Sequence, residues 1–154
     1  MSRLHDLLDH YGRDHENATN QAIHLVCVPA ILWSIIAMIW TIPVPGTWFQ
    51  PGAFAGLTMA ALAAWYFRGS RPLGLGAAVA FVAAGALCWA IANAIGMRGL
   101  LIVAIAVFVA AWIGQFIGHR IEGKRPSFFT DLVYLLVGPA WTLSKLYRRF
   151  GIAY

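Results

Sequence analysis

Long stretches without any charged side chain are the feature that most constrains this chain. No Asp, Glu, Lys or Arg occurs between Glu16 and Arg68, between Arg71 and Arg98, or between Arg98 and Arg120. In soluble domains about 25% of residues are charged, whereas here 11% are charged and 60% are hydrophobic. These values exclude an ordinary soluble domain, a disordered chain and a disulfide scaffold, and they predict a polytopic membrane protein.

The basic residues behind the net charge of +5 lie in short clusters beside the apolar stretches. This is the pattern of cytoplasmic loops next to anionic lipid, so we expect membrane lipid as a partner and no nucleic acid. Cys27 and Cys88 lie inside apolar stretches and are interpreted as buried thiols without a disulfide. The basic clusters are Arg68 with Arg71, Arg120 with Lys124 and Arg125, and Lys145 with Arg148 and Arg149.

Four apolar stretches are long enough to cross a bilayer, approximately residues 21–42, 51–67, 73–95 and 100–118. Residues 3–13 have apolar side chains at helical spacing, which predicts an amphipathic helix at the membrane interface. Residues 128–143 form a shorter apolar stretch that Asp131, Gly138 and Pro139 interrupt. This pattern fits a re-entrant or interfacial helix at least as well as it fits a helix that crosses the membrane.

These segments predict one integral membrane domain over residues 1–154. We expect an all-α polytopic helix bundle of about four transmembrane helices, with an N-terminal interfacial helix and a C-terminal re-entrant or interfacial helix. Two glycine pairs spaced by four residues, Gly52 with Gly56 and Gly114 with Gly118, predict close contacts between helices.

Basic residues in the turns predict the orientation. The turns at 41–51 and 96–99 contain none and one, whereas the turn at 68–72 contains two and residues 119–127 contain three. The positive-inside rule therefore places the N-terminus, the 68–72 turn and residues 119–127 in the cytoplasm. The apolar stretch that begins near Ile23 is expected to be a retained membrane segment and not a cleaved leader.

This topology brings together polar side chains that are about 100 residues apart in the sequence. Three histidines and a carboxylate at one end of a bundle are typical metal ligands. Imidazole suits Fe, Zn, Cu or Ni, and mixed sites with open positions suit non-haem Fe(II) and oxygen chemistry. The group comprises His15, Asn17, Asn20 and His24 at the start of the first stretch, and Gln115, His119 and Glu122 at the end of the fourth.

Spacing constrains how these residues can share one metal. His24 lies four residues after Asn20, on the same helical face. His15 lies nine residues before His24, which is about 180° round a straight helix. If both histidines bind one ion, the helix must break between them, and Asn17, Thr19 and Asn20 are suitable cap and turn residues for such a break.

The fourth ligand stays open among His10, Glu122 and water. Glu122 has rival roles, because it is also placed to pair with Arg120 or Arg125, or to orient a histidine. The residues by themselves leave the metal and the reaction open.

The two histidine segments resemble those of a known family. Residues 15–24, HENATNQAIH, followed by Val28-Pro29, resemble the first motif of the 2-hydroxy fatty acid dioxygenase family, which includes a fungal phytosphingosine-metabolism protein and bacterial relatives. Residues 115–119, QFIGH, followed by Glu122 and Lys124-Arg125-Pro126, are similar to that family's second motif. The resemblance covers nearly the whole chain in layout.

The resemblance implies an Fe(II)-dependent oxygenase that acts in the α-oxidation of 2-hydroxy fatty acids and shortens them by one carbon. It implies that His15, His24 and His119 hold the iron, with O2 and the 2-hydroxy acid as substrates. The residues expected to take part in catalysis are Glu122, Asn20 and Gln115. Those expected to bind substrate are Arg120, Lys124, Arg125 and Asn17. The expected location is the bacterial inner membrane, with the metal site on the cytoplasmic side.

Two other classes of function stay open. One is a non-catalytic membrane transporter or scaffold whose histidines only form hydrogen bonds. The other is a membrane hydrolase that uses zinc.

Overall fold

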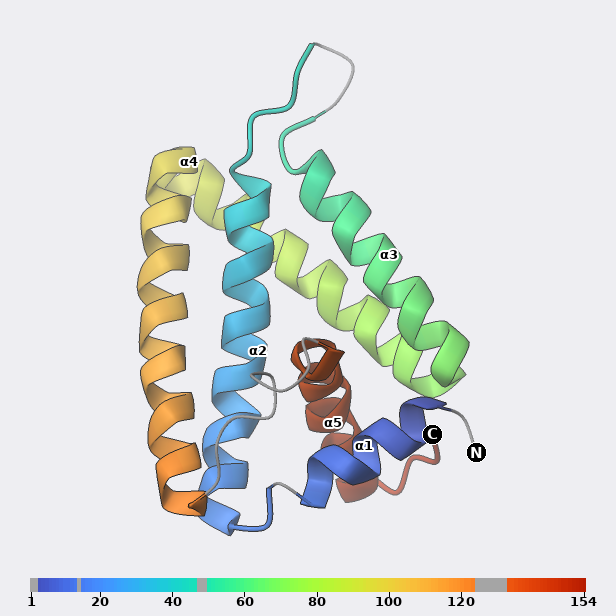
Figure 1. Cartoon of the computed structure of the whole chain (residues 1–154). Helices are drawn as coiled ribbons and strands as arrows, with labels where there is room; N and C mark the ends of the chain where they lie inside the picture. Colours follow the sequence, from blue (N-terminus) through green and yellow to red (C-terminus); the bar gives the residue numbers. More distant parts are fainter. Residues whose placement is uncertain (1–2, 14, 47–49, 124–132) are drawn as a thin grey trace.

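The computed structural model describes residues 3–13, 15–46, 50–123 and 133–154 (Figure 1). Within these ranges the regular structure is helical and no strand occurs, so the all-α expectation is confirmed. The helices are α1 (Arg3–Arg13), α2 (Ala18–Trp40), α3 (Ala53–Gly69), α4 (Arg71–Glu122) and α5 (Val133–Arg149).

Helix α2 begins where its sequence provides a cap. The Asn17 side chain accepts hydrogen bonds from the backbone N–H groups of Thr19 and Asn20, at 2.9 and 3.3 Å. These two groups lack partners inside the helix, so the cap fixes where the helix starts. Pro29 lies inside α2 without ending it.

Helix α4 contains both the third and the fourth predicted membrane helices. A straight helix of 52 residues would be about 78 Å long, far more than the ~30 Å hydrocarbon core of a bilayer. At Gly96 the chain has φ 77° and ψ 168°, a conformation that is essentially restricted to glycine, and α4 turns back on itself there (Figure 1). The expected turn at 96–99 was therefore too long, because the reversal takes place at one glycine.

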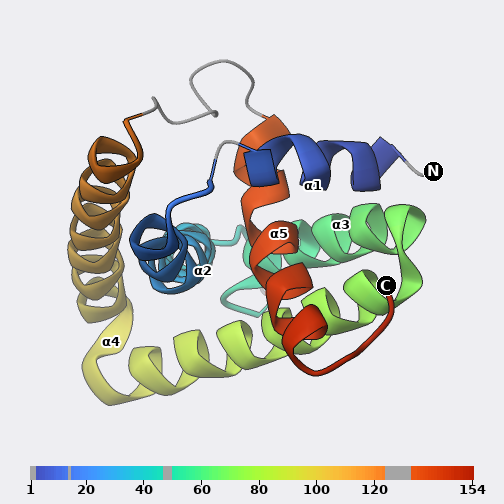
Figure 2. The ribbon, with the colours of Figure 1, turned by 90° about the horizontal axis from the view of Figure 1, so that it is seen from below.

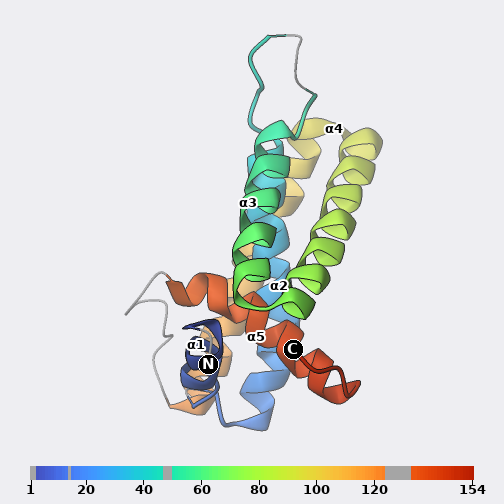
Figure 3. The same ribbon diagram turned by 90° about the vertical axis from the view of Figure 1, so that its right-hand side faces the viewer.

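Helices α2, α3 and the two halves of α4 run along the molecule in alternating directions (Figure 1). The start of α2 and the end of α4 consequently lie at one end, and Gly96 lies at the other. Figure 3 shows the same arrangement from the side, with α1 and α5 lying across the end where α2 begins. This is the juxtaposition of the two histidine segments that the sequence predicts.

Helix α1 packs on protein through its apolar face. Leu4, Leu8 and Tyr11 are buried, and α1 lies against α5 (Figure 2). Gly69, at the end of α3, leaves space for Leu4, since a Cβ there would come within 2.5 Å of the Leu4 side chain. The amphipathic helix is confirmed, and its apolar side is covered by α3 and α5.

The C-terminal apolar stretch is also helical, with different limits. Helix α5 extends to Arg149, beyond the expected end at 143, and residues 128–132 lie outside the described ranges. Pro139 lies within it. Val137, Ala140 and Trp141 are buried and join the core.

One of the two glycine pairs makes the expected close contact. A Cβ at Gly114 would come within 2.6 Å of Cys27 Sγ, and a Cβ at Gly118 within 2.4 Å of Asn20 Oδ1, so α4 approaches α2 closely at both positions. Gly52 packs against Trp40, but nothing lies within 4 Å of a Cβ at Gly56. The close contact expected at Gly56 was therefore wrong.

Two helices of the described part of the chain, α2 and α4, are long and apolar enough to cross a membrane. Helix α3, with 17 residues, is at the lower limit of what can span a bilayer. Length and composition thus support membrane association.

Candidate metal centre

Three buried histidines meet where α2 begins and α4 ends. His15 lies in the link between α1 and α2, His24 in the second turn of α2, and His119 in the last turn of α4. Their exposed fractions are 1%, 0% and 6%. One potential ligand nitrogen from each lies within 4.8 Å of the others, and among the described residues no other group of His, Cys, Asp or Glu side chains is arranged in this way.

Backbone carbonyls determine which ring nitrogens face the centre of this cluster. Nδ1 of His15 is 2.7 Å from the Tyr11 carbonyl oxygen, and Nδ1 of His24 is 3.0 Å from the Asn20 carbonyl oxygen. A carbonyl only accepts, so both Nδ1 atoms carry the proton and, in the neutral rings, both Nε2 atoms carry a lone pair. The two Nε2 atoms lie 3.1 Å apart.

This contact between Nε2 atoms is unfavourable unless a positive charge lies near it. Two lone pairs that face each other at this distance repel, and a proton on either ring would place a positive charge in a buried site. A metal cation relieves both problems, because each lone pair becomes a ligand. The arrangement therefore suits a metal ion better than a set of hydrogen-bonded side chains.

Two of the three nitrogen–nitrogen distances fit one shared ion. Two nitrogens that each lie about 2.0–2.1 Å from a metal are roughly 2.9–3.4 Å apart at bond angles of about 90–110°. The Nε2 atoms of His24 and His119 are 3.2 Å apart, and those of His15 and His24 are 3.1 Å apart. Three imidazoles suit zinc as well as iron, so the donors alone leave the ion open.

The predicted break between His15 and His24 is present. Asn17 caps α2, so His15 stands outside the helix and reaches the same face as His24. The Gln21 side chain holds this link in place, since its Nε2 donates to the His15 carbonyl oxygen at 2.7 Å. Lys145 of α5 in turn donates to Gln21 Oε1 at 3.1 Å. Desolvation by burial, and then the charge of Arg148, lower the pKa of Lys145 below its ordinary value.

Glu122 joins the end of α4 to the start of α2. Its carboxylate accepts hydrogen bonds from the backbone N–H groups of Glu16 and Asn17 and from the Asn20 side chain, at 2.8–3.1 Å. Both oxygens are engaged, and Glu122 is not part of the histidine cluster. Helix N-termini favour negative charge, which adds to this contact. The structure thus gives Glu122 a role in holding the histidine segments together.

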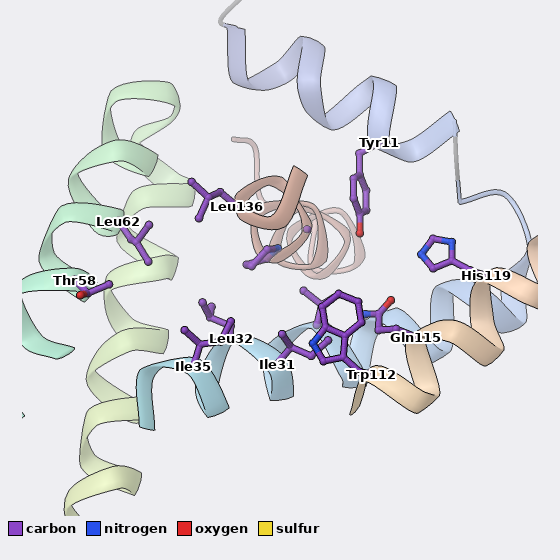
Figure 4. Close-up of a pocket in the computed structure, with 13 residues that line it drawn as sticks. Tyr11, Ile31, Leu32, Ile35, Thr58, Leu62, Trp112, Gln115, His119 and Leu136 are labelled. Carbon is purple, nitrogen blue, oxygen red and sulfur yellow. The ribbon is translucent and has the colours of Figure 1, made fainter. Parts of the chain in front are cut away.

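The remaining predicted residues are either buried, exposed or outside the described ranges. Gln115 is buried and lines an apolar cavity beside His119 (Figure 4). Asn20 is fully buried, bonded to Glu122 and packed on Gly118. Arg120, Asn17 and His10 are exposed. Lys124 and Arg125 lie outside the described residues.

The cavity extends from the histidine cluster into the bundle. Its volume is about 230 Å³. Figure 4 shows His119, Gln115, Tyr11 and Trp112 near one end and Leu62 and Thr58 of α3 near the other. The side chains between them are aliphatic, so this space suits an apolar group.

Sequence reasoning missed the aromatic residues that pack around His15. The Tyr11 ring stacks on the His15 ring, with centroids 4.2 Å apart and planes at 15°. The Trp141 ring lies 5.4 Å from the same imidazole. Tyr11 stands four residues before His15 on the apolar face of α1, which was a usable signal, whereas nothing near Trp141 in the sequence indicates its contact.

Comparison with known proteins adds a family to this geometry. Residues 1–150 match the family model described as 2-hydroxy-palmitic acid dioxygenase Mpo1-like. The chain belongs to this Mpo1-like family. Neither the curated proteins nor the solved structures contain a match to the chain. The family resemblance inferred from the two histidine motifs is thereby confirmed, and the family description implies a dioxygenase that acts on a hydroxy fatty acid.

We predict that replacing His24 by Ala removes most of the bound metal while the helices still form. Loss of a direct ligand should exceed the roughly 10–100-fold fall in affinity that is typical when a residue supporting a ligand is removed. Metal content per chain and far-ultraviolet circular dichroism are the measurements. His10→Ala, an exposed histidine of α1, is the control and should keep its metal. Full metal occupancy in the His24→Ala protein would show that the cluster is not a metal centre.

Glu122 is predicted to act as a structural link and not as a ligand. Glu122→Ala leaves the backbone N–H groups of Glu16 and Asn17 without this acceptor, so Tm should fall while saturating metal still binds at normal stoichiometry. The metal affinity should decrease by roughly 10–100-fold, as for residues that orient ligands, and Glu122→Gln should show a smaller decrease. An unchanged Tm combined with complete metal loss, as in His24→Ala, would instead identify Glu122 as a ligand.

Proposed function

We propose that the protein is an Fe(II)-dependent dioxygenase that converts a 2-hydroxy fatty acid into the acid one carbon shorter. The observation that carries the proposal is the set of buried histidines whose Nε2 atoms face one another 3.1–3.2 Å apart. Membership of the Mpo1-like family supports the dioxygenase reaction and the substrate class. Bound Fe(II) supplies the activation of O2 that a side chain alone cannot provide.

The substrate's own charge suits this site. Three neutral imidazoles bring no negative charge to a divalent cation, and no carboxylate of the described residues joins the cluster. A 2-hydroxy carboxylate supplies a negative charge and two oxygens that chelate one ion. With iron held by His15, His24 and His119, chelation of this kind would hold the bond to be cleaved close to the site of O2 activation, and such positioning lowers a barrier greatly.

The overall reaction balances with one O2. A 2-hydroxy acid plus O2 gives the acid shortened by one carbon, CO2 and water. The bond between the carboxyl carbon and the hydroxyl-bearing carbon breaks, both carbons are oxidised, and O2 is the oxidant. No further reductant is required.

The chain's residues have separate tasks in this proposal. His15, His24 and His119 hold the iron, and the carbonyl groups of Tyr11 and Asn20 fix the orientation of the first two rings. Gln115, beside His119, is the candidate for a hydrogen bond to substrate. Glu122 and the Asn20 side chain position the ligands, and Asn17 caps α2. Arg120, with Lys124 and Arg125, attracts the carboxylate by charge.

We also propose that α2, α3 and both halves of α4 cross the membrane. Large apolar side chains are exposed along them, among them Val26, Leu57, Val82 and Ile102, with exposed fractions of 61–74%. In water such a surface would be unfavourable, whereas lipid accommodates it. With the basic residues inside, the metal centre lies at the cytoplasmic face of a bacterial inner membrane.

This orientation predicts which residues an impermeant reagent reaches. In a background with Cys27 and Cys88 replaced by Ala, Pro45→Cys should react with an impermeant maleimide in intact cells. Arg120→Cys should react only after the membrane is permeabilised. Both positions are exposed at opposite ends of the bundle, so each serves as the control for the other. The reverse labelling pattern would overturn the orientation.

The reaction itself predicts a clear difference between two substrates. Iron-loaded protein should convert 2-hydroxypalmitate to pentadecanoate with matched consumption of O2. Palmitate lacks the second chelating oxygen, so it should show no turnover. Product analysis and an oxygen electrode provide the measurements, and His119→Ala is the inactive control.

The alternatives give different outcomes in the same experiment. Retention of zinc with hydrolytic activity and no O2 uptake would indicate a zinc hydrolase. A stable protein without bound metal would indicate a transporter or scaffold. Equal turnover of palmitate would reject chelation through the 2-hydroxyl group.

A further inference from the structure

The cavity beside the histidine cluster has the shape and chemistry of a site for an alkyl chain. Polar lining groups such as Gln115 and His119 gather near one end (Figure 4). Thr58, near the other end, is polar by type, but its hydroxyl donates to the Phe54 carbonyl oxygen at 2.9 Å, inside its own helix. The Thr58 hydroxyl is therefore already hydrogen-bonded, and a ligand at the far end needs no polar group.

The lining residues give the direction in which the cavity runs. On α4 it is lined from His119 back to Trp112, and on α2 from Val28 to Ile35. Each of these segments covers eight residues, and the seven steps between its ends span about 10 Å along a helix. The cavity thus leads away from the metal centre along the bundle, towards α3.

Leucines limit this cavity at its far side. Leu62 of α3 lies at the end opposite His119 (Figure 4). Leu32 of α2 lines this cavity and also a second apolar cavity of about 340 Å³, bounded by Tyr66 and Phe81 among others. Pro139 of α5 is the other residue common to both. Leu32 and Pro139 therefore stand between the two spaces.

We propose that the cavity holds the part of the substrate's acyl chain that follows the carboxyl end, and that Leu62 and Leu32, at its far side, select the chain lengths that are accepted. This inference rests on the proposed function, since it places the carboxyl end of the substrate at the histidines. It goes further by assigning chain-length selection to two residues that contact neither the metal ligands nor the reacting carbons.

The volume of the cavity explains why Leu62 and Leu32 would influence the chain length of the substrate. A dry engineered cavity of about 150 Å³ binds benzene, so the 230 Å³ here accommodates an apolar group of moderate size. Sites for whole ligands are usually larger, about 300–1,000 Å³. A long chain consequently reaches the far wall, and the side chains there decide which lengths are accepted.

The test compares chain-length profiles of variants that change the far wall in opposite directions. Leu62→Trp fills the far end, so kcat/KM for 2-hydroxylaurate relative to 2-hydroxypalmitate should rise by at least about tenfold, a typical effect of a misfit in an apolar pocket. Leu32→Ala opens the way to the second cavity, so the relative kcat/KM for 2-hydroxystearate should rise. Ratios of kcat/KM cancel any general loss of active protein.

Matched controls use leucines that line neither cavity. Leu57→Trp on α3 and Leu75→Ala on α4 change side chains that are 71% and 61% exposed, and their profiles should equal that of the unmodified protein. Unchanged profiles in both Leu62→Trp and Leu32→Ala would overturn the inference. Lack of turnover with every 2-hydroxy acid in the unmodified protein would instead overturn the proposed function.

A second measurement needs neither metal nor turnover. Trp112 lines the cavity, so stearate brominated at mid-chain should quench its fluorescence on binding. The Trp112→Phe protein should lose that part of the quenching. Equal quenching in both proteins would show that the chain lies outside this cavity, whatever the outcome of the activity assays.

Discussion

The contact between the Nε2 atoms of His15 and His24 is the constraint on which the site depends. Each ring gives its Nδ1 proton to a backbone carbonyl, so the facing nitrogens, 3.1 Å apart, are both acceptors in the neutral rings. Such a contact is unfavourable unless a positive charge, from a metal ion or a proton, lies beside it. The fold must therefore hold the rings firmly, and the Tyr11 ring stacked on His15 contributes to that.

Holding His119 against the other two rings requires α4 to approach α2 closely. Gly118 makes this possible, because a Cβ there would collide with Asn20 Oδ1. Glu122, one turn later, then reaches the backbone N–H groups at the start of α2. Gly118 thus allows the two helices to approach because it has no side chain. Glu122, in the adjacent turn, accepts the hydrogen bonds that join them. Both features bring together histidines that are about 100 residues apart in sequence.

Local signals in the sequence predicted the helices, a break in the chain among Asn17, Thr19 and Asn20, and the meeting of the two histidine segments. The length of the stretches without charged residues predicted the helices, and the types of the polar side chains predicted the break. The presence of basic residues in alternate turns predicted that the histidine segments meet. The single-residue reversal at Gly96 was not predicted, because a positive φ at one glycine leaves no mark in periodicity. The Trp141 contact with His15 and the hydrogen bonds of Glu122 were missed for a different reason. They depend on how α5 and α2 pack in space, and hydropathy patterns carry no information on such pairings.

The position of the site at the end of the bundle separates two physical requirements that one substrate imposes. A charged head group needs a cation and polar partners, and the proposed metal centre at the end of α4 and the link before α2 would provide them. An alkyl chain needs an apolar space, which the largely aliphatic interior between α2, α3 and α4 provides. A site in the middle of the bundle would have to bury the charge far from the basic residues near the helix ends. A site outside the bundle would leave the alkyl chain of the substrate in water, or the site would have to compete with lipid for it. The location at the boundary resolves this conflict, since His119 and Gln115 line the same cavity as Leu62 and Thr58.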